Sequence, residues 1–358
     1  MIDFLIIGGG MAGASAAARL SELGSIVLLE SESALGYHAS GRSAALFEES
    51  YGKPSTVALN AASRIYHETA HGGFLSPRGL MMIGTADTAE DFAADCKTMS
   101  LNAMSVEEAR AMLPILNPNV VDRAAWHSDA LDIDTDRLIQ CFAADARANG
   151  GRVVTGAGVT AIRKIPTGWV VEAGETYEAR VIVNAAGAWV DQVAKLAGVA
   201  PLGATPLRRS MGRIPAPGGH DVSSWPMIFG PGETWYAKPD AGALLVSPAD
   251  EELVEPHDAW ADDMVLAEGF ARYEAHVTEP VTRLLSSWAG LRTFAPDRSL
   301  VLGPDPADAS WVWCACQGGY GIQTSPAASQ FLADMVGGRP SELGSDVTAQ
   351  LLPDRLRS

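Results

Sequence analysis

The stretch that decides the fold is IIGGGMAGASAA at residues 6–17. It carries the pattern G-x-G-x-x-G as Gly8, Gly10 and Gly13, directly after an apolar run and at the start of an expected helix over 13–23. The first glycine permits a tight turn, the second lets the backbone approach a pyrophosphate, and the third lets helix and strand pack closely. The free N–H groups of the helix N-terminus favour phosphate. The stretch predicts the start of a dinucleotide-binding βαβ unit.

A second expected strand over 25–30 ends in Glu30, which lies 22 residues after Gly8. An acid at this position accepts a hydrogen bond from a ribose hydroxyl. It would repel a 2′-phosphate, so the pattern disfavours NADP. The fingerprint does not separate NAD from FAD.

The rest of the chain predicts an α/β (mixed α+β) fold with interleaved domains. Helical patterns and capping signals occur at 55–69, 87–90, 105–108, 134–149, 264–275 and 321–336, and strands are expected at 153–155, 159–165, 169–173, 179–184 and 311–316. Lys238 to Gly242 reads as a hairpin turn. We expect a Rossmann-like nucleotide-binding domain from 1–45, 134–200 and 295–358, and a β-rich substrate-binding domain from 46–133 and 201–294.

Charge and length exclude several classes of protein. The 358 residues suit roughly two domains. The net charge of −17, without a Lys/Arg cluster, excludes a nucleic-acid footprint and disfavours docking on anionic lipid. Asp3, four glycines and Arg19 within the first 20 residues argue against a secretory signal or a membrane span. We therefore expect no integral membrane segment and a cytoplasmic location, with peripheral membrane association left open.

The four cysteines have no disulfide-framework spacing and suit reduced thiols. Cys314 and Cys316 lie in WVWCAC, which reads as a buried strand. Residues two apart on a strand share a face, so we expect both thiols to pack in one core. No metal site is predicted.

Several segments resemble the FAD-dependent D-amino acid oxidase superfamily, closest to the D-arginine dehydrogenase branch. They are IIGGGMAGASAA at 6–17, GYHASGRSAA at 36–45, NAAGAWVD at 184–191, WYAKPDAG at 235–242, WAGLRTF at 288–294 and QGGYGIQTS at 317–325. The resemblance implies an FAD-binding domain. Some relatives attach flavin to a cysteine near the WAGLRTF segment, and no cysteine lies there, so we expect non-covalent FAD.

The resemblance also implies which residues contact the cofactor. In the loop 36–45, small residues, hydroxyls and Arg42 suit phosphate contact. The glycines of 318–321 would let N–H groups approach the flavin, and the following helix would stabilise negative charge on it. The predicted cofactor residues are Gly8, Gly10, Met11, Ala12, Gly13, Glu30, Ser31, Ser40, Gly41, Arg42, Ser43, Val159, Ala186, Gly187, Trp189, Gly318, Gly319, Tyr320, Gly321, Ile322 and Gln323.

At the substrate end, Arg292 matches the family's carboxylate-binding arginine. Arg209 matches a second arginine and Tyr236 an assisting tyrosine, while Arg208 stays open as the alternative to Arg209. Arginine binds a carboxylate with two parallel hydrogen bonds. Tyr51 completes the predicted catalytic set, although no side chain clearly qualifies as a general base.

The side-chain pocket departs from the D-arginine branch. Leu80 stands where that branch has an acid, Leu46 replaces a histidine, and Glu48 replaces a threonine. The predicted lining is Leu46, Glu48, Leu80, Met227, Phe229 and Gly319. An unpaired guanidinium is costly in an apolar pocket, so we expect poor activity on D-Arg and D-Lys and better activity on aliphatic or aromatic D-amino acids. Glu48 leaves open a restored preference for a basic substrate.

The resemblance implies oxidative deamination of a small D-amino acid. Hydride passes from Cα to flavin N5, and the imino acid hydrolyses to a keto acid and ammonia. The electron acceptor stays open among a quinone, an electron carrier and O2. The alternatives are a sarcosine or N-methyl amino acid oxidase, a 2-hydroxy acid oxidoreductase, a flavoprotein subunit of a larger complex, and an NAD-dependent dehydrogenase. The hydroxy acid reaction needs a base, often histidine, and His38 is expected in the phosphate loop instead.

Overall fold

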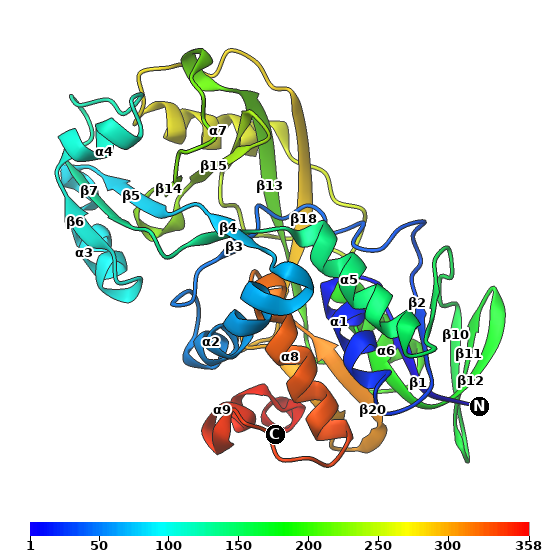
Figure 1. Cartoon of the computed structure of the whole chain (residues 1–358). Helices are drawn as coiled ribbons and strands as arrows, with labels where there is room; N and C mark the ends of the chain where they lie inside the picture. The colour runs from blue at the N-terminus through cyan, green and yellow to red at the C-terminus, as the bar shows by residue number, and fades with distance from the viewer. Residues whose placement is uncertain (358) are drawn as a thin grey trace.

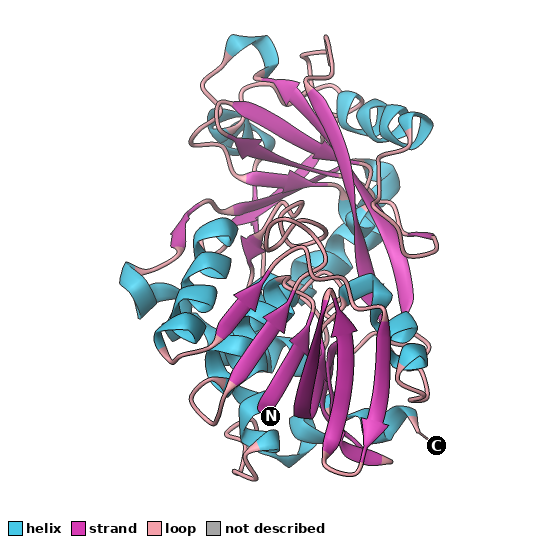
Figure 2. Cartoon of the chain, turned by 90° about the vertical axis from the view of Figure 1, so that its right-hand side faces the viewer, coloured by secondary structure: helices cyan, strands magenta, loops and turns pink. Residues whose placement is uncertain are grey.

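The computed structural model describes residues 1–357, and the chain forms two main sheets (Figures 1 and 2). In the first sheet five strands are parallel, and an antiparallel strand and an antiparallel hairpin are added to them. Its order is β9 (Arg152–Val154), β2 (Ile26–Leu29), β1 (Ile2–Ile7), β12 (Glu175–Asn184), β20 (Asp308–Ala315) and β19 (Val301–Asp305). The hairpin of β10 (Ala161–Ile165) and β11 (Gly168–Ala173) pairs with the first half of β12.

Alternating residues of β1 explain why both faces of this sheet are covered. Phe4 and Ile6 pack in a core with α1 (Met11–Leu20) and α8 (Gly321–Val336), whereas Leu5 and Ile7 pack with β11 and α6 (Val190–Leu196). A central parallel strand is apolar on both sides for this reason. The helices α5 (Thr135–Ala148) and α2 (Pro54–Thr69) complete the helical layer by packing on α1 and α8 respectively (Figure 1).

The second sheet is mostly antiparallel and forms the upper lobe of Figure 1. Its order is β17 (Glu252–Leu253), β13 (Thr205–Pro215), β16 (Ala243–Ser247), β15 (Tyr236–Asp240), β14 (Met227–Phe229), β5 (Leu80–Gly84), β7 (Arg123–His127) and β6 (Asn102–Met104). The helices α3 (Ala89–Thr98), α4 (Val106–Met112) and α7 (Asp263–Glu274) pack on it. A small sheet of β3 (Leu46–Phe47), β8 (Leu131–Ile133) and β4 (Leu75–Pro77) lies between the two lobes.

The long strand β18 (Ser286–Phe294) pairs with β13 over its whole length. This antiparallel pair runs from the upper lobe toward the first sheet (Figure 1). The pair therefore brings residues of the second sheet close to the loop beside the nucleotide turn. Gly290 of β18 packs so closely there that a Cβ on it would lie 3.2 Å from the Cα of Ala39.

Most of the expected elements form, and some boundaries differ. The predicted helix over 134–149 is α5, with Asp134 accepting a hydrogen bond from the Arg137 N–H at its start. The capping box predicted at 87–90 is wrong, because Thr85 and Thr88 form the box and α3 begins one residue later. Val159 precedes β10 instead of beginning it, and the C-terminal helix α9 (Gly344–Leu351) was not expected.

The two neighbouring cysteines are buried as predicted, but they do not share a face. Cys314 packs in the core beneath α8, and Cys316 packs in the core on the opposite side of the sheet. β20 ends at Ala315, and Cys316 has a left-handed φ of 59°, which turns its side chain across. The alternation rule failed because Cys316 lies one residue beyond the strand.

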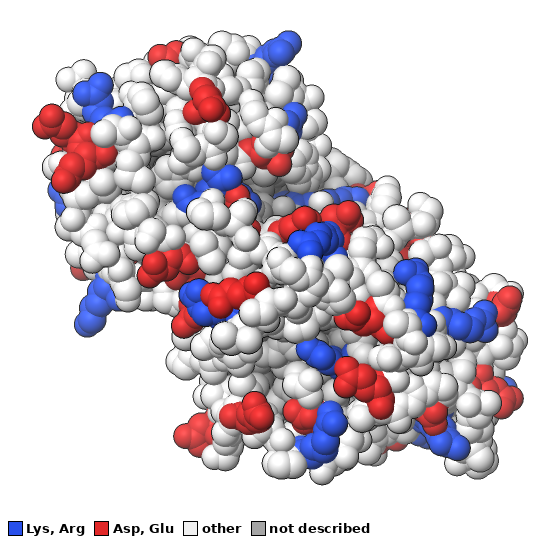
Figure 3. All heavy atoms as spheres, viewed as in Figure 1, with Lys and Arg blue, Asp and Glu red and all other residues white. Residues whose placement is uncertain are grey.

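Surface charge, helix hydropathy and the placement of possible metal ligands bear on which partners the protein can have. Acidic and basic side chains are interspersed on the face shown in Figure 3. Within residues 1–357 no helix combines the length and apolarity needed to cross a bilayer. The same residues contain no cluster of three or more His, Cys, Asp or Glu side chains placed to hold a metal ion.

The predicted domain boundaries remain a proposal. The first sheet draws its strands from 2–29, 152–184 and 301–315, and the second draws on 80–127 and 205–294. Helix α2 lies in the proposed 46–133 segment, yet it packs on α8 of the first lobe. Leu59 of α2 is fully buried in that core.

Candidate active site

The glycine turn is packed too closely for any side chain at its first and third glycines. Gly8 has φ of +108°, and a Cβ there would lie 2.4 Å from the Ala185 carbonyl oxygen. A Cβ on Gly13 would lie 1.8 Å from the Gly8 carbonyl oxygen. The N-terminus of α1 therefore sits directly against the end of β1. Its first-turn N–H groups lack partners within the helix, so apart from that of Met11, which donates to Ser40, they can face a ligand.

Glu30 closes this turn as well as facing the cavity. It is 7% exposed, and its carboxylate accepts hydrogen bonds from the N–H groups of Gly9 at 2.6 Å and Glu32 at 2.8 Å. The Ser31 hydroxyl donates to it at 3.1 Å. These bonds hold the carboxylate at the position where a ribose would lie. Its remaining lone pairs can accept a hydrogen bond from a ribose hydroxyl.

Two adjoining cavities lie beside the turn. The nucleotide cavity has a volume of about 370 Å³, and its lining includes Gly8, Gly10, Glu30, Ser31, Ser40, Arg42, Val159, Ala186, Gly187 and Trp189. The arginine cavity has a volume of about 270 Å³, and its lining includes Gly10, Met11, Ala12, Ser40, Arg42, Ser43, Leu46, Glu48, Tyr51, Leu80, Gly187, Arg209, Met227, Phe229, Tyr236, Arg292, Gly318, Gly319, Gly321, Ile322 and Gln323. Because they share Gly10, Ser40 and Gly187, the two cavities adjoin each other, and the pair is called the channel. Of the predicted site residues, Gly13, Gly41 and Tyr320 line neither cavity.

The loop 36–45 is held against the turn, but Arg42 has other partners than the expected phosphate. Ser40 accepts a hydrogen bond from the Met11 N–H at 3.0 Å. The Arg42 guanidinium donates to the Asp258 carboxylate and to the carbonyl oxygens of residues 37, 259 and 289. Four of its five N–H groups are used in this way. Arg42 thus ties the loop to the 258–259 segment.

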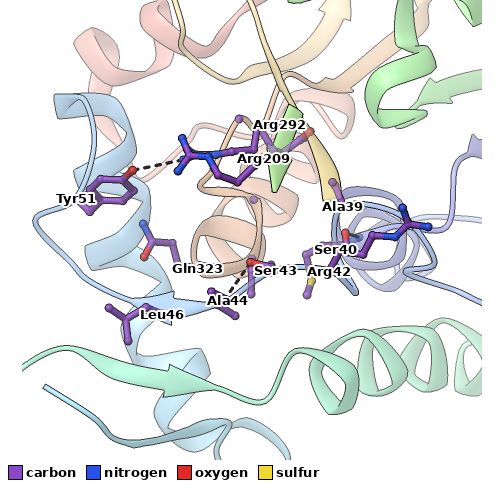
Figure 4. Close-up of a pocket in the computed structure, with 18 of the residues that line it drawn as sticks. Ala39, Ser40, Arg42, Ser43, Ala44, Leu46, Tyr51, Arg209, Arg292 and Gln323 are labelled. Carbon is purple, nitrogen blue, oxygen red and sulfur yellow. Dashed lines mark hydrogen bonds between the residues drawn. The ribbon is translucent and has the colours of Figure 1, made fainter. Parts of the chain in front are cut away.

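The register of β13 and β18 decides between Arg208 and Arg209 as the partner of Arg292. Arg292 lies opposite Leu207, and Arg209 is two residues further along β13, so Arg209 and Arg292 point to the same face. Arg208 points to the other face, where it pairs with Asp250 and Glu252. Arg209 and Arg292 line the arginine cavity, and Arg208 does not (Figure 4).

Arg292 is fixed by a glycine and a tyrosine. A Cβ on Gly319 would lie 1.6 Å from Nη2 of Arg292, so the guanidinium occupies the space that a side chain would fill. The same Nη2 donates to the Tyr51 hydroxyl at 3.4 Å (Figure 4). Burial lowers the pKa of the guanidinium, but the neighbouring Tyr51 and Glu233 raise it overall. Arg292 stays charged at any working pH.

Tyr51 is poorly suited to be a base, and Glu233 is a site residue that the sequence did not reveal. Burial raises the pKa of Tyr51, so its hydroxyl stays protonated and donates to Glu233 at 3.0 Å. Glu233 lines the arginine cavity and has a left-handed φ of 51°. Its signal in the sequence was an acid on a Gly-Pro-Gly turn just before Tyr236.

The side-chain wall of the cavity is apolar apart from one acid. Leu80 and Met227 are paired neighbours on β5 and β14, and Leu46 and Phe229 line the same cavity. Met99, Met211 and Thr293 also line it and were not predicted.

Glu48 is already engaged by protein groups. Its carboxylate accepts from the Ser50 N–H at 3.1 Å and lies 3.0 Å from Nε2 of His127. Nδ1 of His127 accepts a hydrogen bond from the Asp129 N–H, so a neutral His127 carries its proton on Nε2, facing Glu48. Burial would raise the pKa of Glu48, but the hydrogen bonds from His127 and Ser50 lower it overall.

Gln323 offers an unused donor in the lining of the arginine cavity. Its Oε1 accepts from the Glu48 N–H at 3.1 Å, while its Nε2 has no hydrogen-bond partner among residues 1–357. The residue is 3% exposed and lines the arginine cavity. A buried N–H without a partner is costly, so it points to a ligand acceptor. A flavin carbonyl or ring nitrogen suits it, and the glycine turn suits the diphosphate of the same molecule.

These features together define a class of protein. A doubly covered parallel sheet with a dinucleotide turn, joined by a channel to a pair of half-buried arginines, is the arrangement of a dinucleotide-dependent oxidoreductase with a separate substrate lobe. The sequence profile of the DAO family, described as FAD dependent oxidoreductase, matches residues 3–335. The chain belongs to this family, and FAD is its cofactor.

Curated relatives are similar over part of their length. FAD-dependent oxidoreductase domain-containing protein 1 of Bos taurus is 29% identical over 175 residues, which is 44% of this chain and 36% of that protein. L-2-hydroxyglutarate dehydrogenase of Escherichia coli (strain K12) is 26% identical over 216 residues, which is 56% of this chain and 51% of that protein. The chain thus spans between about a third and a half of the length of these relatives.

Solved structures match over nearly the whole chain. Glycine oxidase from Geobacillus kaustophilus has a TM-score of 0.81 at 21% identity, covering 95% of this chain and 96% of that one. L-α-glycerophosphate oxidase from Mycoplasma pneumoniae, with FAD bound, has a TM-score of 0.82 at 18% identity, covering 94% of each chain. At these identities the likeness shows a shared fold.

Proposed function

We propose that this chain oxidises the Cα–N bond of a small α-amino acid with an apolar side chain, with the D-enantiomer preferred. The observation that carries the proposal is the pair Arg209 and Arg292, which point into one cavity beside the flavin end of the channel. Two arginines on one face suit an α-carboxylate. The motif resemblance to D-amino acid dehydrogenases supports the preferred enantiomer.

FAD bound non-covalently in the channel would accept the hydride, which carries both electrons, released from Cα. The protein's own task is to orient the substrate. Arg292 holds the carboxylate with Arg209 beside it, and Tyr51 and Gly319 fix the guanidinium. Tyr51 stays protonated, so the amine loses its proton to solvent before the reaction. The product imino acid then hydrolyses to a keto acid and ammonia.

The lining supports an amine over an alcohol and an apolar over a basic side chain. Among the described residues, none that lines the arginine cavity is histidine, the commonest base for oxidation of a hydroxyl, and its acids Glu48 and Glu233 already accept hydrogen bonds from Ser50 and Tyr51. Glu48 already contacts Ser50 and His127, which weakens its attraction for a second cation. Leu46, Leu80 and Met227 would leave a substrate guanidinium unpaired.

The test is an anaerobic bleaching screen of the FAD-loaded protein. The panel contains D- and L-amino acids, N-methyl amino acids including sarcosine, and 2-hydroxy acids. We expect the flavin absorbance to fall fastest with an aliphatic or aromatic D-amino acid. D-Arg as the best substrate would contradict the apolar pocket. Bleaching by sarcosine alone, or by a hydroxy acid alone, would replace the proposal with that reaction.

A further inference from the structure

One carboxylate, that of Glu251, is shared by three arginines. Its Oε1 lies 3.3 Å from Nη2 of Arg209, 3.6 Å from Nη1 of Arg292 and 3.0 Å from Nη2 of Arg298. Arg209 and Arg292 are the two arginines of the cavity, and Glu251 itself lines neither cavity. The acid therefore contacts the guanidinium groups from behind, away from the space that a substrate would occupy.

The backbone holds Glu251 firmly in this position. The preceding Asp250 accepts hydrogen bonds from the N–H of Ser210 at 2.6 Å and from its hydroxyl at 2.8 Å. The Asp250 carbonyl accepts from Nε of Arg209 at 2.9 Å. Glu252, the next residue, turns to Arg208 on the far face of β13. Of the carboxylates of these three consecutive acids, only that of Glu251 reaches the cavity arginines.

The charges around the arginine end leave room for one negative charge. Three guanidinium groups contribute +3, and Glu251 and Glu233 contribute −2, so the difference is one positive charge before Glu48 on the side-chain wall is counted. A single substrate carboxylate balances it. A second anionic group would reach the side-chain wall, where Glu48 already carries a negative charge.

We propose that Glu251 is a specificity-determining residue that selects monocarboxylates over substrates with a second carboxylate or a phosphate. The inference rests on the proposed function, since it takes Arg292 as the carboxylate site. Glu251 does not touch the substrate. It acts by fixing the orientation of the two arginines and by reducing their positive potential. Without that reduction, the potential would attract a dianion more strongly than a monoanion.

The test compares Glu251→Gln with Glu252→Gln, a matched control that loses the same charge one residue away and on the other face of β13. The FAD-loaded proteins are titrated with acetate and with malonate above pH 7, following the change in flavin absorbance on binding. Because Glu251 is 34% exposed, solvent screens its effect, and we expect roughly threefold tighter acetate but about tenfold tighter malonate in Glu251→Gln. Glu252→Gln should bind both ligands as the wild type does.

Two further variants separate the possible failures. Glu251→Asp keeps the charge and should keep the wild-type preference for acetate. Arg292→Met should weaken both ligands, and if it does not, the carboxylate site and hence the proposed function are wrong. If Arg292→Met weakens binding but the acetate-to-malonate ratio is unchanged in Glu251→Gln, or shifts equally in Glu252→Gln, the role of Glu251 alone is refuted.

Discussion

The two ends of the channel are built from different parts of the polypeptide. At the nucleotide end, backbone packing at Gly8 and Gly13 and the N-terminus of α1 make the site within one short stretch, which Glu30 closes. At the arginine end, side chains do the work, and Tyr51, Arg209, Glu233 and Arg292 come from segments far apart in the chain. The first kind of site tolerates no added atom, whereas the second kind can be retuned one side chain at a time.

The largest effect is expected where the backbone makes the site. In Gly13→Val the new Cβ would collide with the Gly8 carbonyl oxygen, which lies 1.8 Å from its ideal position. Because backbone must move on both sides of the turn, we expect loss of FAD binding and a destabilisation of at least about 4 kcal/mol. Flavin content and thermal unfolding of the purified variant measure both.

The control is Gly158→Val, at a glycine that lines the nucleotide cavity. Its Cβ would lie 3.8 Å from the Ser31 side chain, at ordinary contact distance. It should retain FAD and a near-normal melting temperature. A yellow, stable Gly13→Val protein would break the contrast between the two ends.

The next effect concerns a buried histidine behind the arginine cavity, next to Gln323. His67 is fully buried on α2, its Nε2 donates to the Gln323 carbonyl at 2.8 Å, and its Nδ1 has no partner among residues 1–357. Burial lowers the pKa of His67 to about 4. As the pH falls below about 6.5, the unfolded chain takes up a proton that the folded chain refuses, so stability falls between pH 6.5 and 4 by up to about 3 kcal/mol.

Urea unfolding at several pH values, with tryptophan fluorescence as the signal, measures this slope. His67→Gln keeps a donor for the Gln323 carbonyl but cannot take up a proton. It should show a flatter profile between pH 6.5 and 4.5, above the range where most carboxylates titrate. An equally steep profile in His67→Gln would assign the acid sensitivity to other groups.

The smallest effect is expected at a single side chain of the substrate end. Leu80→Glu places a carboxylate on the apolar wall, on the strand beside Met227. A charge-assisted pair contributes about 1.5–3 kcal/mol, so kcat/KM for D-Arg relative to D-Leu should rise roughly 10- to 100-fold. Leu80→Gln, of the same shape without the charge, should leave the ratio within about threefold of the wild type. Equal shifts in both variants would show that size, and not charge, sets the preference.

The same contrast explains how much could be predicted from the sequence. The strand–turn–helix around Gly8 to Gly13 is contiguous, so its residue pattern predicted the fold and the nucleotide end directly. The helices α5 and α8 were predicted because capping residues and glycines mark their ends. These elements could be predicted without a structure because the residues that define each one are contiguous in the sequence.

The substrate end was predicted only through the resemblance, and incompletely. The choice between Arg208 and Arg209 depends on the phase of β13 against β18, which no local pattern gives. Glu233 and Glu251 were missed, because an acid in a loop looks like a solvated residue until the fold brings Tyr51 to the first and Arg292 to the second. Arg42 shows the reverse: a cation expected at phosphate bonds to a segment more than 200 residues away.

The central claim is that one channel holds FAD by its backbone end while Arg292 anchors a carboxylate at the other. Anaerobic stopped-flow reduction of FAD-loaded wild type and Arg292→Met, with the best amino acid of the panel, tests it most directly. We expect both proteins to carry one FAD, and the second-order rate constant of bleaching to fall about 10³-fold in the variant, since a buried charge-assisted pair is lost. A wild-type protein that takes up no FAD, or a variant bleached as efficiently as the wild type, would contradict the account.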